Sequence, residues 1–194
     1  MSLLSDLLRS YWLPGLNSVT GRQTGSIGNW VLARKFQVYT PLVPSGGRLS
    51  FSAIQPLLEA FASDVARFST AAFESADGIS QNSALPKSIA WLLIRCYYSA
   101  FFAAHATLRL LGRGATQFEG GHLLSIHTVA DIYSMRNGVA LSSGVYGSVV
   151  DVANAEILIT RCAGASGGSH VAMWAEYTAL LSHLINGLLP TGHT

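Results

Sequence analysis

Histidine and arginine are the residue types in this chain that could act on a phosphate group. The sequence holds six histidines among its 194 residues, and most of its 12 basic residues are arginines. A guanidinium presents a planar fork of donors that suits phosphate oxygens, and histidine changes its protonation near neutral pH. The basic residues are scattered, and only Arg34 and Lys35 are adjacent. These residue types therefore permit binding to a nucleic acid without demanding it.

The histidines and cysteines lack the spacing of a metal site. His122 and His127 are five residues apart rather than four, and no carboxylate cluster accompanies them. The two cysteines exclude a disulfide framework, and the apolar surroundings of Cys96 predict a buried free thiol. The sequence also has no glycine-rich phosphate loop, nucleophile elbow or paired-carboxylate motif. We therefore expect neither a metal nor another cofactor.

The stretch from Pro86 to Leu111 predicts one long apolar helix, with proline at its start and glycine just after its end. At 100° per residue its polar side chains form one narrow seam, edged by Trp91, Tyr98 and Phe102. Two interpretations of this seam stay open. It could face a protein partner, or it could line a groove for an RNA base or phosphate. In the second case the candidate RNA-binding residues are Arg95, Tyr98, Ser99 and Arg109.

The same stretch is long enough to span a membrane, but its charges disfavour that interpretation. Arg95, His105 and Arg109 lie inside it, and an arginine near the bilayer centre costs at least ~2.5 kcal/mol. The N-terminus lacks the basic start and the cleavage site of a signal peptide. We expect a buried helix in a soluble, cytoplasmic protein that has no contact with a membrane.

The run from Arg95 to Ala106 (RCYYSAFFAAHA), followed by LRLLG, resembles the tyrosine- and alanine-rich helix of HEPN domains. These domains are small helical bundles of prokaryotic toxin–antitoxin and phage-defence systems. The later sequence GGSH at 167–170, with Trp174 in the helix that follows, is also similar to HEPN-related chains. The resemblance covers about residues 53–188. It implies a four- or five-helix bundle that often dimerises and, in active members, a metal-independent ribonuclease with a closely spaced arginine and histidine.

No histidine of this chain has an arginine at the short spacing of that family. Arg136 and Asn137 are similar to the start of the family's motif, and we count them as candidate RNA-binding residues, although no histidine follows in range. The best remaining catalytic pair is Arg161 and His170, which have eight residues between them.

A helix that begins near Ser169 would offer free backbone N–H groups to an anion beside this pair. As the resemblance implies, His170 would then act as acid or base and Arg161 would stabilise the phosphate charge, with Arg95 in support. The alternative is that Ser169 is an ordinary N-cap and that His170 faces solvent.

The composition predicts a surface that a partner covers. The chain is 49% hydrophobic and only 11% charged, with a mean hydropathy of +0.36 and a net charge of +2. A surface with so few charges tends to associate. We therefore expect a homodimer or a larger protein complex, with RNA as a further partner.

Hydrophobic periodicity predicts a mainly α fold. The expected helices are residues 2–13, 53–76, 86–111, 122–136, 149–163 and 170–188. The segment from Trp30 to Tyr39 has the pattern of a short strand, for which Gly138 to Val152 is the best pairing partner. The expected loops include residues 41–50 and 112–121. The sum is an antiparallel four- to five-helix bundle over residues 51–194, preceded by a small N-terminal extension over residues 1–50.

Three functions are compatible with these expectations. The first is a HEPN-like protein of a bacterial antiviral defence or toxin–antitoxin system that binds RNA or cuts it without a metal. The second is a non-catalytic helical scaffold that dimerises or docks on a larger effector. The third is a regulator that binds a small molecule among the aromatic residues around Trp91 and Tyr98.

Overall fold

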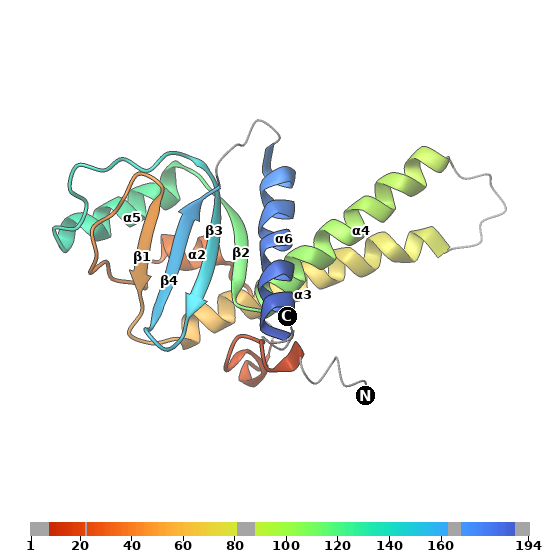
Figure 1. Ribbon diagram of the computed structural model, residues 1–194, viewed down its shortest axis with the longest axis horizontal. Helices are drawn as coiled ribbons and strands as arrows, with labels where there is room; N and C mark the ends of the chain where they lie inside the picture. Colours follow the sequence, from red (N-terminus) through yellow and green to blue (C-terminus); the bar gives the residue numbers. More distant parts are fainter. Residues whose placement is uncertain (1–7, 22, 81–87, 163–167, 189–194) are drawn as a thin grey trace, which may run out of the picture.

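The computed structural model describes residues 8–21, 23–80, 88–162 and 168–188. In these ranges the elements are η1 (Leu16–Ser18), α2 (Ile27–Leu32), β1 (Gly46–Ser50), α3 (Gln55–Ser80), α4 (Ile89–Leu110), β2 (Arg113–Phe118), α5 (Gly120–Ile132), β3 (Gly144–Asp151), β4 (Glu156–Arg161) and α6 (Gly168–Leu188). The strands form one antiparallel sheet of order β1-β4-β3-β2 (Figure 1). The prediction of a mainly α, antiparallel helical bundle is therefore wrong, and the fold is α+β.

Four of the predicted long helices are confirmed as α3, α4, α5 and α6. Each carries an apolar face of sufficient length, which is the strongest signal that a sequence gives. Residues 2–7 of the predicted helix over residues 2–13 lie outside the described residues, and of the rest only residues 8 and 9 are helical.

Strand β3 lies within Gly138 to Val152, the segment predicted to pair as a strand, but it pairs with β2 and β4 rather than with residues 30–39. The other strands come from segments that the sequence predicts as loop or helix. The predicted loops at 41–50 and 112–121 contain β1 and β2, and the predicted helix at 149–163 contains the end of β3 and all of β4. The predicted strand from Trp30 to Tyr39 starts as α2, and within it Gln37 forms an isolated bridge with Ser50.

Glycines explain much of this error, because in this sheet they allow close contacts rather than loops. A Cβ on Gly46 would lie 2.0 Å from the carbonyl oxygen of Ile159 on the neighbouring strand. A Cβ on Gly147 would lie 2.5 Å from Oε1 of Glu176 on α6.

Two hydrophobic clusters lie on opposite faces of the sheet. Side chains of β3 alternate between them, since Tyr146 belongs to the first cluster and Val145 to the second. The first cluster joins α2, α3 and α5 to the sheet and includes residues from Leu13 to Leu49, so the predicted N-terminal extension shares this core. The second cluster packs α4 and α6 against β2 and β3.

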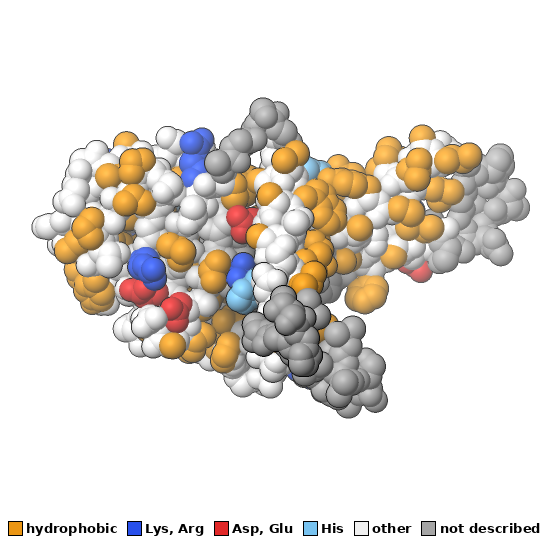
Figure 2. Space-filling model, in the orientation of Figure 1, with side chains coloured by type: hydrophobic (Ala, Val, Ile, Leu, Met, Phe, Trp, Pro, Cys, Tyr) orange, Lys and Arg blue, Asp and Glu red, His pale blue; other side chains and the backbone are white. Residues whose placement is uncertain are grey.

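Helices α3 and α4 form an antiparallel hairpin that projects away from the sheet (Figure 1). Its outer half is strongly apolar at the surface, and Figure 2 shows hydrophobic side chains over much of its visible part. The exposed large apolar side chains of this half are Phe73, Ile89, Trp91, Leu93, Ile94, Tyr97 and Tyr98. The expectation that α4 is buried along its length is therefore wrong, and Cys96, predicted to be buried, is exposed.

Among the described residues, α4 is the one helix long and apolar enough to cross a membrane by length and composition. Its inner part, residues 101–110, lies inside the protein, where Phe101, Leu108 and Arg109 are buried. The free part, residues 89–100, measures about 18 Å at 1.5 Å per residue, whereas a hydrocarbon core is about 30 Å thick. The helix as a whole therefore does not fit a membrane span.

Candidate functional site

The polar seam of α4 faces α3, and its side chains Arg95 and Ser99 are partly buried there. Arg95 donates from Nε and Nη2 to the carbonyl oxygens of Ser75 and Glu74, at 3.2 and 3.1 Å. Ser99 Oγ donates to the carbonyl oxygen of Ala72 at 3.1 Å. The structure has a third arrangement, which neither interpretation of the seam included. These side chains join the two helices of one hairpin.

Arg109 ends the seam in a buried ion pair. Its Nε donates to Asp64 Oδ2 at 3.1 Å, and both side chains are 2% exposed. Nη2 donates to Thr116 Oγ1 at 2.8 Å and to the carbonyl oxygen of Ala115 at 3.2 Å, so one guanidinium joins α3, α4 and β2. Burial lowers the pKa of Arg109, and Asp64 opposes that shift. The role of this predicted RNA-binding residue in the fold is structural.

Glycine at position 114 makes room for that guanidinium. A Cβ at Gly114 would lie 2.0 Å from Nη1 of Arg109 and 2.7 Å from Oγ of Ser148. No side chain tolerates such contacts without a shift of its neighbours.

His105 lies one helical turn before Arg109 and lines a cavity of about 350 Å³. Its ring stacks on Phe68 with the centroids 4.6 Å apart and meets the edge of Phe101 at 4.7 Å. Burial, reinforced by Arg109 and then Arg67, lowers the pKa of His105 to about 4, so the ring is neutral at pH 7. Its Nδ1 is buried and has no hydrogen-bond partner among the described residues.

A second imidazole enters the same cavity from α5. Nδ1 of His122 accepts a hydrogen bond from the backbone N–H of Glu119 at 3.2 Å, so in the neutral ring the proton sits on Nε2. That Nε2 atom lies against Gly28, where a Cβ would be only 2.9 Å away. The rings of His105 and His122 thus line one cavity, whereas the unpartnered Nδ1 of His105 is buried behind its surface.

The rest of the lining adds positive charge and further donors. Arg67 donates to Asp64 Oδ1 at 2.8 Å, but its side chain is 63% exposed and stands at the rim. Thr116, Gln117 and Ser169 complete the polar wall. Ser169 lies in the first turn of α6, whose N-terminus carries a partial positive charge. Asp64 is the single carboxylate of the lining and is already bound to two guanidiniums, so the cavity suits an anion.

Aromatic side chains lie next to this cavity and reach the surface. Phe101, one of the lining residues, stacks on His170 with the centroids 4.4 Å apart. Tyr97 Oη lies 2.7 Å from Nδ1 of His170 and accepts a hydrogen bond from Trp174 Nε1 at 3.2 Å. Tyr98 meets the His170 ring edge-on at 6.0 Å. We call Tyr97, Tyr98, Phe101, His170 and Trp174 the aromatic cluster.

The predicted catalytic pair has separate partners. His170 belongs to the aromatic cluster. Arg161, at the end of β4, donates from Nη2 to the carbonyl oxygen of Ser143 at 3.3 Å and lies against Gly144. No contact between the two is among those of the described residues.

The predicted pair Arg136 and Asn137 follows α5. Arg136 forms an ion pair with Asp131 at 2.9 Å and donates to the carbonyl oxygen of Val139 at 3.1 Å. Asn137 has a φ of 48°, which asparagine tolerates in a turn. Both residues serve the turn and line none of the cavities described here.

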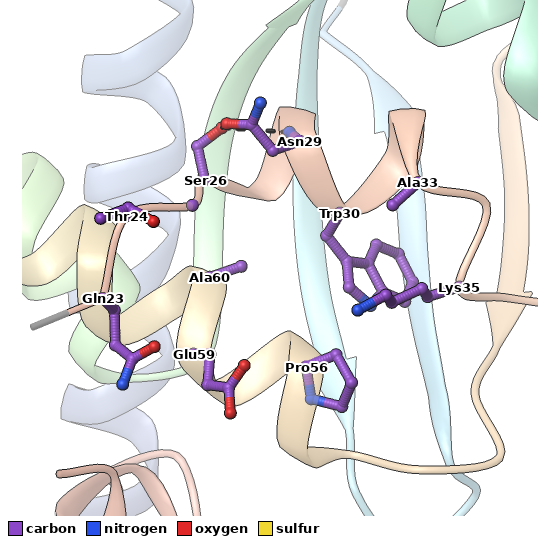
Figure 3. Close-up of a pocket in the computed structure, with 11 residues that line it drawn as sticks. Gln23, Thr24, Ser26, Asn29, Trp30, Ala33, Lys35, Pro56, Glu59 and Ala60 are labelled. Atoms are coloured by element: carbon purple, nitrogen blue, oxygen red, sulfur yellow. Dashed lines mark hydrogen bonds between the residues drawn. The ribbon is translucent and has the colours of Figure 1, made fainter. Parts of the chain in front are cut away.

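A second cavity of about 230 Å³ lies between α2 and the start of α3 (Figure 3). Ser26 lines both cavities, and its Oγ caps α2 by accepting from the N–H of Asn29 at 3.1 Å. Lys35 and Glu59 contribute one charge of each sign. This cavity lacks the histidines of the first, which is why we place the candidate site at His105.

The described residues include no group of three or more histidine, cysteine or acidic side chains that could hold a metal ion. Burial and Glu176 raise the pKa of Cys162 to about 11, so its thiol stays protonated at neutral pH and is a poor nucleophile.

Compared with known protein families, with curated proteins and with solved structures, the chain matches none of them. The resemblance to HEPN domains stays a prediction.

Sequence reasoning missed His105 and His122 as a pair. They lie on α4 and α5, and strand β2 separates these helices in the sequence. Because that strand was predicted as a loop, the spacing of the two histidines gave no reason to place them together. The signal that could have identified His105 is its four-residue separation from Arg109, which puts both side chains on one side of a helix.

Proposed function

We propose that this protein binds single-stranded RNA and cleaves it without a metal ion at the cavity lined by His105 and His122. The observation that carries the proposal is that two imidazoles, of His105 and His122, and the guanidinium of Arg67 line one anion-suited cavity. A phosphodiester is the biological anion that needs these groups together.

The chemistry that fits these groups is attack by the 2′-hydroxyl on the adjacent phosphate. His105 is neutral at pH 7, so its ring can accept the 2′-hydroxyl proton while the 2′-oxygen forms a bond to phosphorus. The bond from phosphorus to the 5′-oxygen breaks, and the leaving oxygen takes a proton from water. His122 Nε2–H and Arg67 donate hydrogen bonds to the non-bridging oxygens, where negative charge increases. A bound phosphate also offsets the positive charges of Arg109 and Arg67, which raises the pKa of His105.

The aromatic cluster favours a single strand over a duplex. Tyr97 and Tyr98 are each 39% exposed and lie beside the cavity through Phe101. Exposed rings next to a cationic groove offer stacking surfaces for unpaired bases, worth about 1–3 kcal/mol per base. A base on the cluster would place its phosphate toward His105.

The cellular role that we propose follows the resemblance of the α4 sequence to HEPN domains. An RNA-cleaving chain of this kind would act in the cytoplasm, in a bacterial antiviral defence or toxin–antitoxin system. This proposal rests on the cavity and not on the architecture, because the fold is α+β and not a helical bundle.

Binding is tested with a fluorescein-labelled RNA of about 15 nucleotides, followed by anisotropy at ~50 and ~200 mM salt. We expect Arg67→Gln, at the exposed rim, to weaken binding about fivefold or more at the lower salt, as one lost phosphate contact does. The matched control is Arg136→Gln, which removes an exposed guanidinium that is also paired with an aspartate. Equal affinity of the wild type and Arg67→Gln would count against the site.

Cleavage is tested on the same RNA and on a DNA copy of the same sequence, whose 2′-deoxyribose sugars have no 2′-hydroxyl. We expect a 2′,3′-cyclic phosphate product from RNA alone, and loss of activity in His105→Gln and His122→Gln. Thermal melting confirms that both variants fold. Activity that survives in His105→Gln, or that cuts the deoxy strand, would contradict the mechanism and point to a contaminating nuclease.

A second candidate function is a non-catalytic interaction subunit, and the apolar outer half of the hairpin favours it. Phe73 is 76% exposed and Ile89 is 75% exposed, which is unusual for large apolar side chains on neighbouring helices. A chain that binds no RNA at the lower salt but associates through this half would support this function over the first.

A further inference from the structure

The outer half of the α3–α4 hairpin carries a regular stripe on α4. Ile89, Leu93, Cys96 and Ala100 are all exposed and follow one another at steps of four, three and four residues. This spacing keeps them within about 60° of one another on the helix, as in the contact seam of two packed helices. The residues that face α3, including Arg95 and Ser99, lie on a separate stripe. Helix α4 therefore presents a second helix-packing seam that nothing in the described chain covers.

A groove between the two helices begins at the inner end of this stripe, near Ser99, and continues toward Leu110. It measures about 350 Å³, and small side chains such as Ser69, Ala72 and Ala103 line it. Phe73 stands at its edge and is 76% exposed. A large apolar knob and an apolar groove of small residues thus share one face, so this face is complementary to a copy of itself.

We propose that this face, made of Phe73, the stripe and the groove, binds a second copy of this chain across a two-fold axis. In a two-fold interface the same patch occurs on both sides, so Phe73 of each copy would enter the groove of the other. The inference deepens the second candidate function by naming its partner, and it does not need the RNA site.

The size of the face fits a dimer. Counting about 200 Å² for a fully exposed large side chain, the exposed parts of Phe73, Ile89 and Leu93, with the groove, add up to roughly 500 Å² of apolar surface. A standard interface buries about 800 Å² on each partner, of which about two thirds is apolar in homodimers.

Charge favours a second copy over a lipid surface or a charged protein. The stripe has no charged side chain, so it offers nothing to a partner of opposite charge. Helices that lie on membranes carry lysine and arginine along their polar face. In the described part of this half the neighbouring charges on α3 are instead Glu74 and Asp77, and Arg95 is bound to carbonyl oxygens of α3.

The proposed face does not obstruct the RNA site. On a wheel of 100° per residue, His105 lies about 150° from the centre of the stripe. A dimer formed through this face would leave both cavities open.

The test measures the mass of the full chain by light scattering and ultracentrifugation between about 1 and 100 µM. We expect a dimer with a dissociation constant in this range or below it, and a dissociation constant raised at least ~tenfold by Leu93→Glu and by Phe73→Glu. The matched control is Ile132→Glu, at the end of α5, where the isoleucine is 72% exposed. Circular dichroism shows whether each variant folds.

Cross-linking gives a second measurement that needs no disruptive change. In a Cys162→Ser background, a short bis-maleimide should join Cys96 of two copies, because Cys96 lies in the centre of the stripe. A monomer at all concentrations, a dimer that Leu93→Glu leaves intact, or co-sedimentation of the wild type with phosphatidylcholine–phosphatidylglycerol vesicles would each overturn the proposal. None of these results bears on RNA binding in the Arg67 and His105 variants.

Discussion

The two halves of the α3–α4 hairpin have the same helices and opposite surroundings. In the inner half, near the sheet, Asp64, His105 and Arg109 are buried among other elements. In the outer half, Ile89 and Leu93 are exposed. Polar groups are thus inside at one end of the hairpin, and apolar groups are outside at the other.

This contrast shows that the two ends have different requirements. At the inner end, a buried charge is stable because its partners are fixed, as Asp64, Thr116 and the carbonyl oxygen of Ala115 are for Arg109. At the outer end, apolar surface remains in contact with water, and a second molecule bound there would bury it. A ligand site fits the first condition and a protein interface fits the second.

The largest effect that tests this contrast comes from Asp64→Asn. The change leaves the guanidinium of Arg109 buried without its counter-charge, so we expect a loss of about 3–5 kcal/mol in the free energy of unfolding, measured with urea. Asp131→Asn removes the carboxylate of an exposed pair and should cost no more than ~1 kcal/mol. Similar losses in both variants would mean that the buried ion pair of the inner half contributes no more to stability than an exposed ion pair does.

The pH dependence of stability tests the inner half a second way. The pKa of His105 is about 4 in the folded chain and 6.5 in its ordinary state, so between these values the unfolded chain binds more protons. Its contribution to stability is complete above pH 6.5 and is lost as the pH falls toward 4, by about 3 kcal/mol in all. His105→Gln should remove this part of the slope in urea titrations at several pH values. A wild type and variant with parallel slopes would show that His105 is not buried as neutral imidazole.

Gly114→Ala should have a smaller effect, through packing alone. The added methyl would meet Nη1 of Arg109, so we expect a loss of about 1–3 kcal/mol. Gly120→Ala is the matched control, because a Cβ there meets nothing within 4 Å and alanine should be neutral or stabilise by up to ~1 kcal/mol. A harmless Gly114→Ala would mean that Arg109 has room to move.

The smallest effect is expected in the outer half, from Arg95→Gln. The change removes two hydrogen bonds to carbonyl oxygens of α3, and we expect a loss of about 0.5–1.5 kcal/mol. Amide hydrogen exchange should accelerate in residues 89–98 and stay unchanged around Arg109. Faster exchange along the whole of α4 would show that the two halves unfold together.

The sequence predicts the helices better than the sheet, and the reason lies in particular residues. Leu57, Leu58 and Phe61 repeat at helical steps and are buried as expected. The strands, by contrast, contain Gly114 and Gly147 because Arg109 and Glu176 need that space, and such needs arise only after the chain has folded. Around Gly114, glycine therefore indicated a loop where the structure has strand β2.

The candidate site could be predicted only in part for the same reason. Arg109 was identified as a polar residue of α4, but its partner Asp64 is 45 residues earlier in the chain. His122 reaches the cavity through the position of α5 beside β2 and α2, which no local pattern encodes. The sequence showed which polar side chains the seam contains, but it did not show that they contact α3.

The uninterrupted run of α4 from Ile89 to Leu110 has a thermodynamic consequence. A second copy would bind at one end of this rod, and a phosphate would bind at the other. If either event turns the rod about its axis, the two affinities become linked, and the factor by which RNA strengthens or weakens self-association equals the factor by which self-association changes the affinity for RNA. Measured together, the two equilibria would report the coupling free energy between the two ends of α4.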